Sequence, residues 1–182
     1  MSLQPGVYRL GPDDGTLALR TGRTGVAAKA GHDLLIHVTK WDATIQVSAD
    51  GADVSIELNV DGGSLVVAEG TGGIKALGDD DKTNIKKTID DEILKRQPIT
   101  FRSTRVVPAT GGTGRRVEGD LMLLQTSRQI AFDLPMGDDG ALGTGVKVKQ
   151  TDWGIKPYST LFGTLKVADE VEVRIDVRIP AA

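Results

Sequence analysis

Residues 171–179 read Val-Glu-Val-Arg-Ile-Asp-Val-Arg-Ile, and this stretch decides the fold class. Its apolar residues occupy every second position, with charged residues between them. Successive side chains of a β-strand point to opposite faces, so this alternation predicts a strand with one buried face and one solvated face. Val54, Ile56, Leu58 and Val60 alternate with polar residues in the same way and predict a second such strand.

The same period recurs along most of the chain. It predicts further strands at residues 6–10, 15–20, 33–39, 41–47, 99–107, 117–123 and 130–134. Asp50-Gly51 supplies a turn that joins two of these strands into a hairpin over about 40–61. About eight to ten short strands without alternating helices disfavour a parallel βαβ architecture and favour an all-β sandwich or up-and-down barrel.

One segment breaks this pattern. Between residues 80 and 96 the apolar period changes to about 3.6, with Ile85, Ile89 and Ile93 spaced four apart. This predicts an amphipathic helix that begins with aspartates, ends with a Lys-Arg pair and is terminated by Pro98. The apolar stripe is narrow, so we expect the helix to lie across one end of the sheet. A lid and a plain crossover helix packed on the sheet both fit, and we favour the crossover helix.

Composition limits the classes of function. A length of 182 residues fits a single domain over 1–182 with a sizeable core. The net charge of −3 and the lack of clustered Lys and Arg argue against nucleic-acid binding. Aromatic residues make up only 4% of the chain, so any interior surface is expected to be mainly aliphatic.

The chain has no cysteine and only two histidines. Disulfides, thiolate zinc sites and thiol nucleophiles are therefore excluded, and we expect no metal site and no bound cofactor other than a non-covalent lipid. No apolar run approaches the length of a membrane helix, and the first residues do not resemble a signal peptide. We therefore expect no integral membrane segment and a cytoplasmic location, although a removed signal peptide would leave the same picture.

Gly31-His32-Asp33 is the strongest candidate in the sequence for a catalytic or polar binding cluster. Adjacent residues on a strand face opposite sides, so His32 and Asp33 form a poor general-base pair. A hydrogen-bonded structural or pocket role for His32 is favoured over a catalytic one. No serine lies in a strand-turn-helix elbow, and the aspartates at 79–81 suit a helix start better than a calcium loop. We therefore expect no catalytic residues and no enzyme.

The inward face of the strands remains as the candidate functional surface. A closed sheet of about eight strands leaves an interior that side chains fill or that holds one slender ligand. Walls of Val, Leu, Ile and Ala suit an aliphatic chain better than a flat fused ring. Periodicity alone does not separate a filled interior from a hollow one.

Several segments, in their shared order, resemble the YceI-like family of lipocalin-like, polyisoprenoid-binding proteins. The resemblance runs over about 7–179. It is carried by Tyr8-Arg9-Leu10, Ala30-Gly31-His32-Asp33-Leu34 ahead of the Trp41 strand, residues 98–104 (PITFRST), residues 117–121 (VEGDL), residues 151–155 (TDWGI) and Asp169-Glu170-Val171. The chain departs from the family at Gln150-Thr151, where many members have a basic residue, and at Gln125-Thr126, where they carry a glycine.

The resemblance implies an eight-stranded antiparallel lipocalin-like barrel with the helix near one end. It also implies a long-chain isoprenoid or fatty amphiphile, for example an isoprenoid quinone, held in the lumen for transport or sequestration. The candidate ligand-binding residues are His32 near a polar end and, as wall or mouth residues, Trp41, Phe101, Phe132, Trp153, Tyr158 and Phe162. Two alternatives stay open: a filled-core interaction or stress protein that acts through its loops, and a His32-dependent enzyme. A homodimer with a longer tunnel also stays open.

Overall fold

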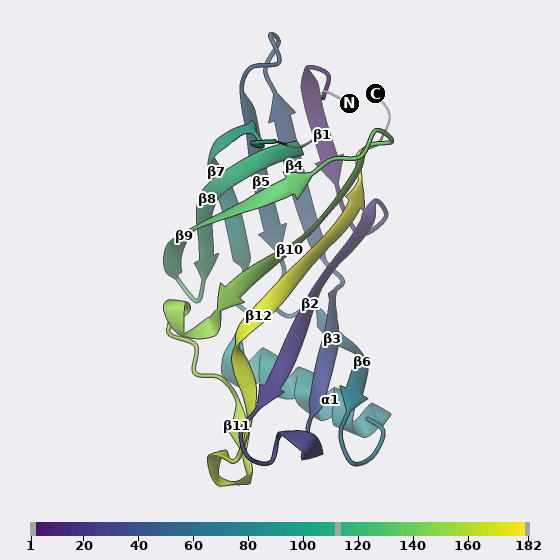
Figure 1. Ribbon diagram of the computed structural model, residues 1–182, viewed down its shortest axis with the longest axis vertical. Coiled ribbons are helices and arrows are strands. Elements are labelled where there is room, and N and C mark those ends of the chain that lie inside the picture. Colours follow the sequence, from purple (N-terminus) through teal and green to yellow (C-terminus); the bar gives the residue numbers. More distant parts are fainter. Residues whose placement is uncertain (1–2, 112–113, 181–182) are drawn as a thin grey trace.

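The computed structural model describes residues 3–111 and 114–180 (Figure 1). Within these residues the chain forms twelve strands in two antiparallel sheets, together with one α-helix. The first sheet has the order β1 (Gly6–Leu10), β4 (Trp41–Val47), β5 (Val54–Val60), β7 (Ile99–Pro108), β8 (Gly114–Leu123), β9 (Thr126–Pro135). The second has the order β10 (Ala141–Lys149), β12 (Leu165–Arg178), β2 (Gly15–Thr24), β3 (His32–Val38), β6 (Leu65–Gly72), with β11 (Ser159–Thr160) paired to β12. The predicted all-β class is confirmed.

Alternation along the strands explains the sheets. β12, which contains residues 171–178 of the alternating stretch, pairs with both β10 and β2, so it lies inside its sheet. The predicted hairpin is present as β4 and β5, with Trp41 opposite Val60 and Val47 opposite Val54.

β6, β10 and β11 were not predicted. Glycines at 143 and 145 in β10 and at 70 and 72 in β6 dilute the apolar alternation that marks a strand.

The implied eight-stranded closed barrel differs from the structure. Where β9 and β10 would close the sheets on each other, their only bridge among the described residues pairs Met136 with Leu142. Near it, the Thr144 hydroxyl donates a hydrogen bond of 2.8 Å to the Asp133 carbonyl. Beyond this point the two strands diverge (Figure 1), so no ladder forms between them.

The helix begins where predicted and ends earlier. α1 (Asp79–Thr88) continues as a π-helical turn over Ile89–Ile93, and Lys95 and Arg96 take left-handed φ angles of 53° and 54°. The helical segment is therefore two residues shorter than the predicted range of about 80–96. The wider turn places both Ile89 and Asp90 in the interior. Lys86 and Arg96 lie 2.9 and 3.4 Å from the buried Asp90 carboxylate.

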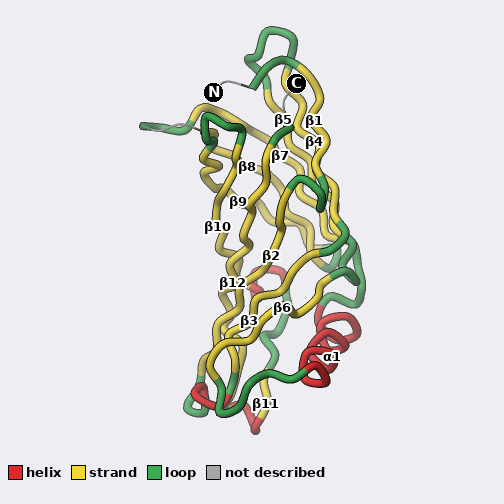
Figure 2. Tube along the Cα trace, turned by 90° about the vertical axis from the view of Figure 1, so that its right-hand side faces the viewer, coloured by secondary structure: helices red, strands yellow, loops and turns green. Residues whose placement is uncertain are grey.

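The core lies between the two sheets, and Val117 on β8 is fully buried within it. Figures 1 and 2 place α1 and β11 at the end of the molecule away from the chain termini. Among the described residues, no helix combines the length and the apolar character needed to cross a membrane. One end of the interior is therefore bordered by the helix and by the β11 segment.

Candidate ligand cavity

A cavity of about 490 Å³ opens inside this end of the molecule. Its walls are the inner faces of β2, β3 and β12, the facing ends of β5, β7 and β8, and α1 with its π-helical turn. The apolar lining residues are Leu17, Leu19, Leu34, Ile36, Val38, Leu58, Val60, Leu65, Ile85, Ile89, Ile93, Leu94, Ile99, Leu121, Leu123, Val148, Ile155, Leu165, Val167, Val171 and Val173. The interior at this end is hollow and almost wholly aliphatic.

The cavity follows the strands for a considerable length. On β2 the lining alternates from Leu17 to Arg23, and on β12 it extends from Val167 to Val173. The β2 path covers six residue steps, which at about 3.3 Å per residue corresponds to roughly 20 Å, whereas a bulge between Val167 and Val171 shortens the β12 path. The shape therefore suits an extended chain.

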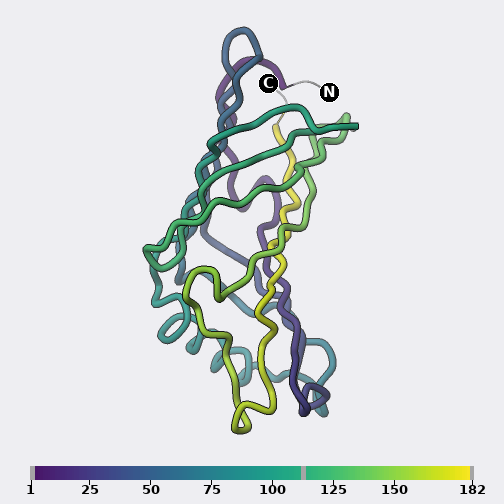
Figure 3. Tube along the Cα trace, turned by 60° about the vertical axis from the view of Figure 1, so that its left-hand side comes forward, coloured from purple at the N-terminus to yellow at the C-terminus, as the bar shows by residue number. Residues whose placement is uncertain are grey.

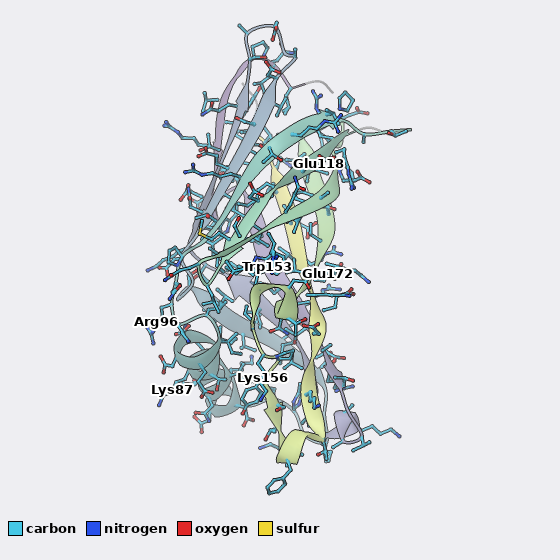
Figure 4. All side chains as sticks on the ribbon, turned by 90° about the vertical axis from the view of Figure 1, so that its left-hand side faces the viewer. Lys87, Arg96, Glu118, Trp153, Lys156 and Glu172 are labelled. Carbon is cyan, nitrogen blue, oxygen red and sulfur yellow. The ribbon has the colours of Figure 1, made fainter. Side chains whose placement is uncertain are left out.

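The helix forms one wall of the cavity. Its predicted apolar stripe, Ile85, Ile89 and Ile93, is the face that lines the space. Lys82 donates a hydrogen bond of 2.9 Å to the Ala68 carbonyl of β6, and Lys86 donates one of 2.9 Å to the Gly63 carbonyl. Lys87 points away from the strands on the outer side of the helix (Figure 4). These anchors are those of a helix packed on the sheet, as favoured from the sequence.

Polar groups gather at the end of the cavity near β11. The Arg23 guanidinium donates hydrogen bonds to the carbonyls of Gly31 and Thr71 and lies 3.7 Å from the Asp33 carboxylate. The other polar side chains of the lining are Thr21, His32, Asn84, Thr88, Gln150, Tyr158, Thr160 and Lys166. No Asp or Glu belongs to the described lining, so its charged groups are cationic.

His32 is held by the backbone of another loop. Its Nε2 lies 2.8 Å from the Lys75 carbonyl oxygen, and since a carbonyl only accepts, this nitrogen donates. Asp33 faces Arg23 rather than the imidazole. The structure therefore separates the two groups, as the alternation of side chains predicts, and gives His32 a positional role at the cavity end.

A carboxylate outside the lining fixes the segment that carries Gln150. The Thr151 N–H and hydroxyl donate to the Asp169 carboxylate at 2.9 and 2.6 Å. These two hydrogen bonds, the hydroxyl's first, lower the pKa of Asp169 below its ordinary value because they favour the charged form. The Gln150 amide in turn donates to the Ala168 carbonyl at 2.9 Å, which orients this side chain at the cavity wall.

Two of the seven candidate residues, His32 and Tyr158, lie in the lining. The other five lie elsewhere. Trp153 is buried and donates a hydrogen bond of 3.0 Å to the Leu121 carbonyl, and Phe101 packs against Phe132 with ring centroids 5.7 Å apart. Trp41 is a buried core residue, whereas Phe162 is fully exposed. The aromatic residues thus mainly support the core.

Sequence reasoning predicted an aliphatic interior but named neither Arg23 nor the individual aliphatic residues of the wall. The signal for Arg23 was present, because Leu17, Leu19, Thr21 and Arg23 continue one period-two face. The strand was predicted to end at residue 20, yet β2 extends to Thr24. In the described part of the chain, no group of three or more His, Asp or Glu side chains is placed to hold a metal ion.

The order of strands, the helix and the cavity can be compared with known proteins. A family model described as YceI-like domain matches residues 17–179. The chain belongs to the YceI-like family. The family prediction made from the sequence is confirmed, and the matched range covers every strand except β1 in full or in part.

Solved structures of other proteins share the fold. The crystal structure of Burkholderia cenocepacia BcnA has a TM-score of 0.61 and 14% identity, with 88% of this chain and 94% of that chain covered. The Campylobacter jejuni YceI protein has a TM-score of 0.53 and 16% identity, with 81% and 84% covered. No curated protein matches the sequence. At these identities the likeness concerns the fold alone.

Proposed function

We propose that this YceI-like protein binds a long-chain polyisoprenoid or a similar amphiphilic lipid, such as an isoprenoid quinone, and carries or sequesters it. The aliphatic cavity of about 490 Å³ is the observation that carries the proposal. Its volume falls within the range of about 300–1,000 Å³ that is usual for small-molecule sites. A length of roughly 20 Å along the strands favours an extended chain over a compact ligand.

Apolar burial is sufficient to hold such a chain. A ligand that buries roughly 300 Å² of its own apolar surface gains about 7 kcal/mol at about 25 cal/mol per Å², before the cost of association. The walls supply contact for this burial through Leu19, Leu34, Ile89 and Val173 on four different elements. No charged contact is required for the chain itself.

The polar end supports one orientation of the ligand. Arg23, His32 and Lys166 border the cavity near β11, whereas the lining around Val38 and Val60 is apolar. A polar head group therefore fits near β11 with the hydrocarbon chain extending away from it. The His32 Nε2–H is already bonded to the Lys75 carbonyl, which supports a positioning role over catalysis.

Extraction of the protein from its native host, followed by mass spectrometry of the organic phase, tests the proposal. We expect about one prenyl or other long-chain lipid per protein molecule. Leu19→Trp places a larger side chain in the cavity and should reduce the lipid recovered, whereas Thr16→Trp, at an exposed position of the same strand, should not. Empty extracts from folded wild-type protein, together with no binding of added isoprenoid, would overturn the proposal.

A further inference from the structure

Large apolar side chains are exposed around the end of the molecule that holds the cavity's polar groups. Three chain segments meet there: residues 25–31 between β2 and β3, residues 73–78 between β6 and α1, and residues 155–164 before β12. We call these three segments the tip. Its exposed apolar residues are Val26, Ile74, Tyr158, Leu161 and Phe162, and Phe162 and Val26 reach 110% and 93% exposure. Only three other large apolar residues of the described chain are exposed, and none belongs to the tip.

The three segments of the tip are held together. The Ala27 N–H donates a hydrogen bond of 3.0 Å to the Thr164 carbonyl, which joins the first and third segments. The His32 bond to the Lys75 carbonyl joins the second segment to β3. Figures 1 and 3 show the segments at the same end, with residues 155–164 descending to it beside the start of β12. The exposed apolar residues therefore belong to one surface.

The tight turn at the end of this surface presents a phenylalanine outward. Ser159 pairs with Lys166 and Thr160 with Leu165, and the Thr164 N–H donates to the Leu161 carbonyl at 3.1 Å. The two central residues, Phe162 and Gly163, have φ angles of 54° and 83°, as in a type I′ turn. Asn, Asp or Gly is usual at the first of these positions, so a Phe there is unfavourable for the fold alone. An intermolecular contact would account for it.

The tip is basic although the whole chain is acidic. The three tip segments contain three Lys (Lys29, Lys75 and Lys156) and no Asp or Glu, and Arg23 and Lys166 flank them, whereas the chain as a whole has a net charge of −3. Arg23 and Lys75 each have a carboxylate partner, at 3.7 and 3.8 Å. Lys29, Lys156 and Lys166 have no ion pair within the described chain, and Figure 4 shows Lys156 below Trp153, on the third segment of the tip.

We infer that the tip docks on an anionic lipid bilayer. Exposed aromatic and aliphatic side chains bordered by lysines match the interface of a membrane with negatively charged head groups. Phe162, Leu161 and Val26 would enter the interfacial layer, and Lys29 and Lys156 would contact head groups. Because Tyr158, Thr160 and Lys166 also line the cavity, this docking would turn the polar end of the cavity toward the bilayer. The inference goes beyond the proposed function, since docking requires no lipid in the cavity.

Sedimentation with vesicles tests this docking. Delipidated protein is mixed at low salt with vesicles of phosphatidylglycerol and phosphatidylcholine, or of phosphatidylcholine alone. We expect stronger binding to the anionic vesicles and weaker binding as salt is added, because salt screens exposed charges. Absence of wild-type binding to both vesicles would overturn the inference and leave the tip as a surface for a protein partner.

Phe162→Asn is the decisive variant. Asn suits the type I′ turn, so the melting temperature should stay equal or rise, while vesicle binding should weaken by about tenfold or more. Val26→Ser, in the first segment of the tip, is an independent second variant and should also weaken vesicle binding. Val7→Asn is the matched control, because Val7 is 60% exposed but lies on β1 at the opposite end of the molecule. Unchanged vesicle binding by folded Phe162→Asn and Val26→Ser proteins would overturn the inference.

Charge reversal separates the electrostatic part. Lys29→Glu combined with Lys156→Glu should weaken binding to anionic vesicles by about tenfold or more and leave binding to phosphatidylcholine unchanged. Arg9→Glu, on exposed β1, should have little effect. Equal losses for the tip pair and for Arg9→Glu would show only a general effect of net charge and would contradict specific docking. Lipid recovered from the cavity is measured separately on each variant, so failure of docking and failure of the proposed function are distinguishable.

Discussion

Ile85 offers a quantitative test of the cavity. It lies on α1, lines the cavity and is only partly buried by the protein itself, so a bound chain would cover its remaining surface. Ile85→Ala removes three carbon groups. At about 0.8 kcal/mol per buried methylene, the full loss of ligand binding energy is about 2.4 kcal/mol. If lipid contacts only one side of the residue, the loss is about half of that, so we expect roughly 8- to 60-fold weaker binding.

The assay is displacement of a fluorescent polyene fatty acid by a soluble isoprenoid alcohol, measured on delipidated protein. Ile130→Ala is the matched control, because Ile130 is also partly buried but packs on β9 outside the cavity. Both variants should unfold in a single transition, and only Ile85→Ala should lose affinity. Equal affinities of the wild type and Ile85→Ala, within a factor of two, would refute the reasoning that this wall contacts the ligand.

Three further predictions concern stability. Trp153→Phe removes a buried hydrogen bond and leaves the Leu121 carbonyl of β8 without this donor. The free energy of unfolding measured in urea should therefore fall by about 1–3 kcal/mol, and an unchanged urea midpoint would contradict this. Asp90→Ala leaves Lys86 without its buried partner, so the free energy of unfolding should fall by about 3 kcal/mol and the melting temperature by roughly 6–12 °C. An unchanged melting temperature would show that the pair contributes nothing to stability. The hydrogen bonds from Thr151 lower the folded-state pKa of Asp169 below 3.8. The stabilisation that the Asp169 carboxylate contributes is therefore present above the unfolded-state pKa, and it is lost as the pH falls through the folded-state pKa. Asp169→Asn should therefore lose less stability than the wild type between neutral pH and about pH 3, and equal acid sensitivity of the two proteins in urea titrations would argue against this.

Much of the fold follows from local patterns. The alternation in residues 171–179 and 54–60 and the change of period at Ile85, Ile89 and Ile93 each gave the correct type of element. The strands that were missed, β6, β10 and β11, carry glycines or are only two residues long, so their own residues give a weak signal. The end of the helix was misplaced because the π-helical turn and the contact between Arg96 and Asp90 depend on packing.

The candidate site was less accessible to sequence reasoning. Aromatic residues were named as candidate wall or mouth residues of an interior expected to be mainly aliphatic, yet Trp153 and Phe101 lie in the core and Phe162 at the tip. Sequence position cannot show which of several apolar faces borders an empty space. His32 and Tyr158 do border the cavity; His32 begins β3, and Tyr158 immediately precedes β11.

The sequence by itself determined that the chain is an all-β protein with one amphipathic helix, and that it belongs with the YceI-like proteins. These features depend on backbone geometry and on the order of neighbouring residues, and both can be read from the amino-acid sequence. Only the tertiary structure decided that the inward faces leave a cavity, that twelve strands form two sheets, and that distant loops join into one basic and apolar tip. Those outcomes depend on the spacing between the sheets and on contacts between distant segments, such as Lys86 with the Gly63 carbonyl and Ala27 with Thr164.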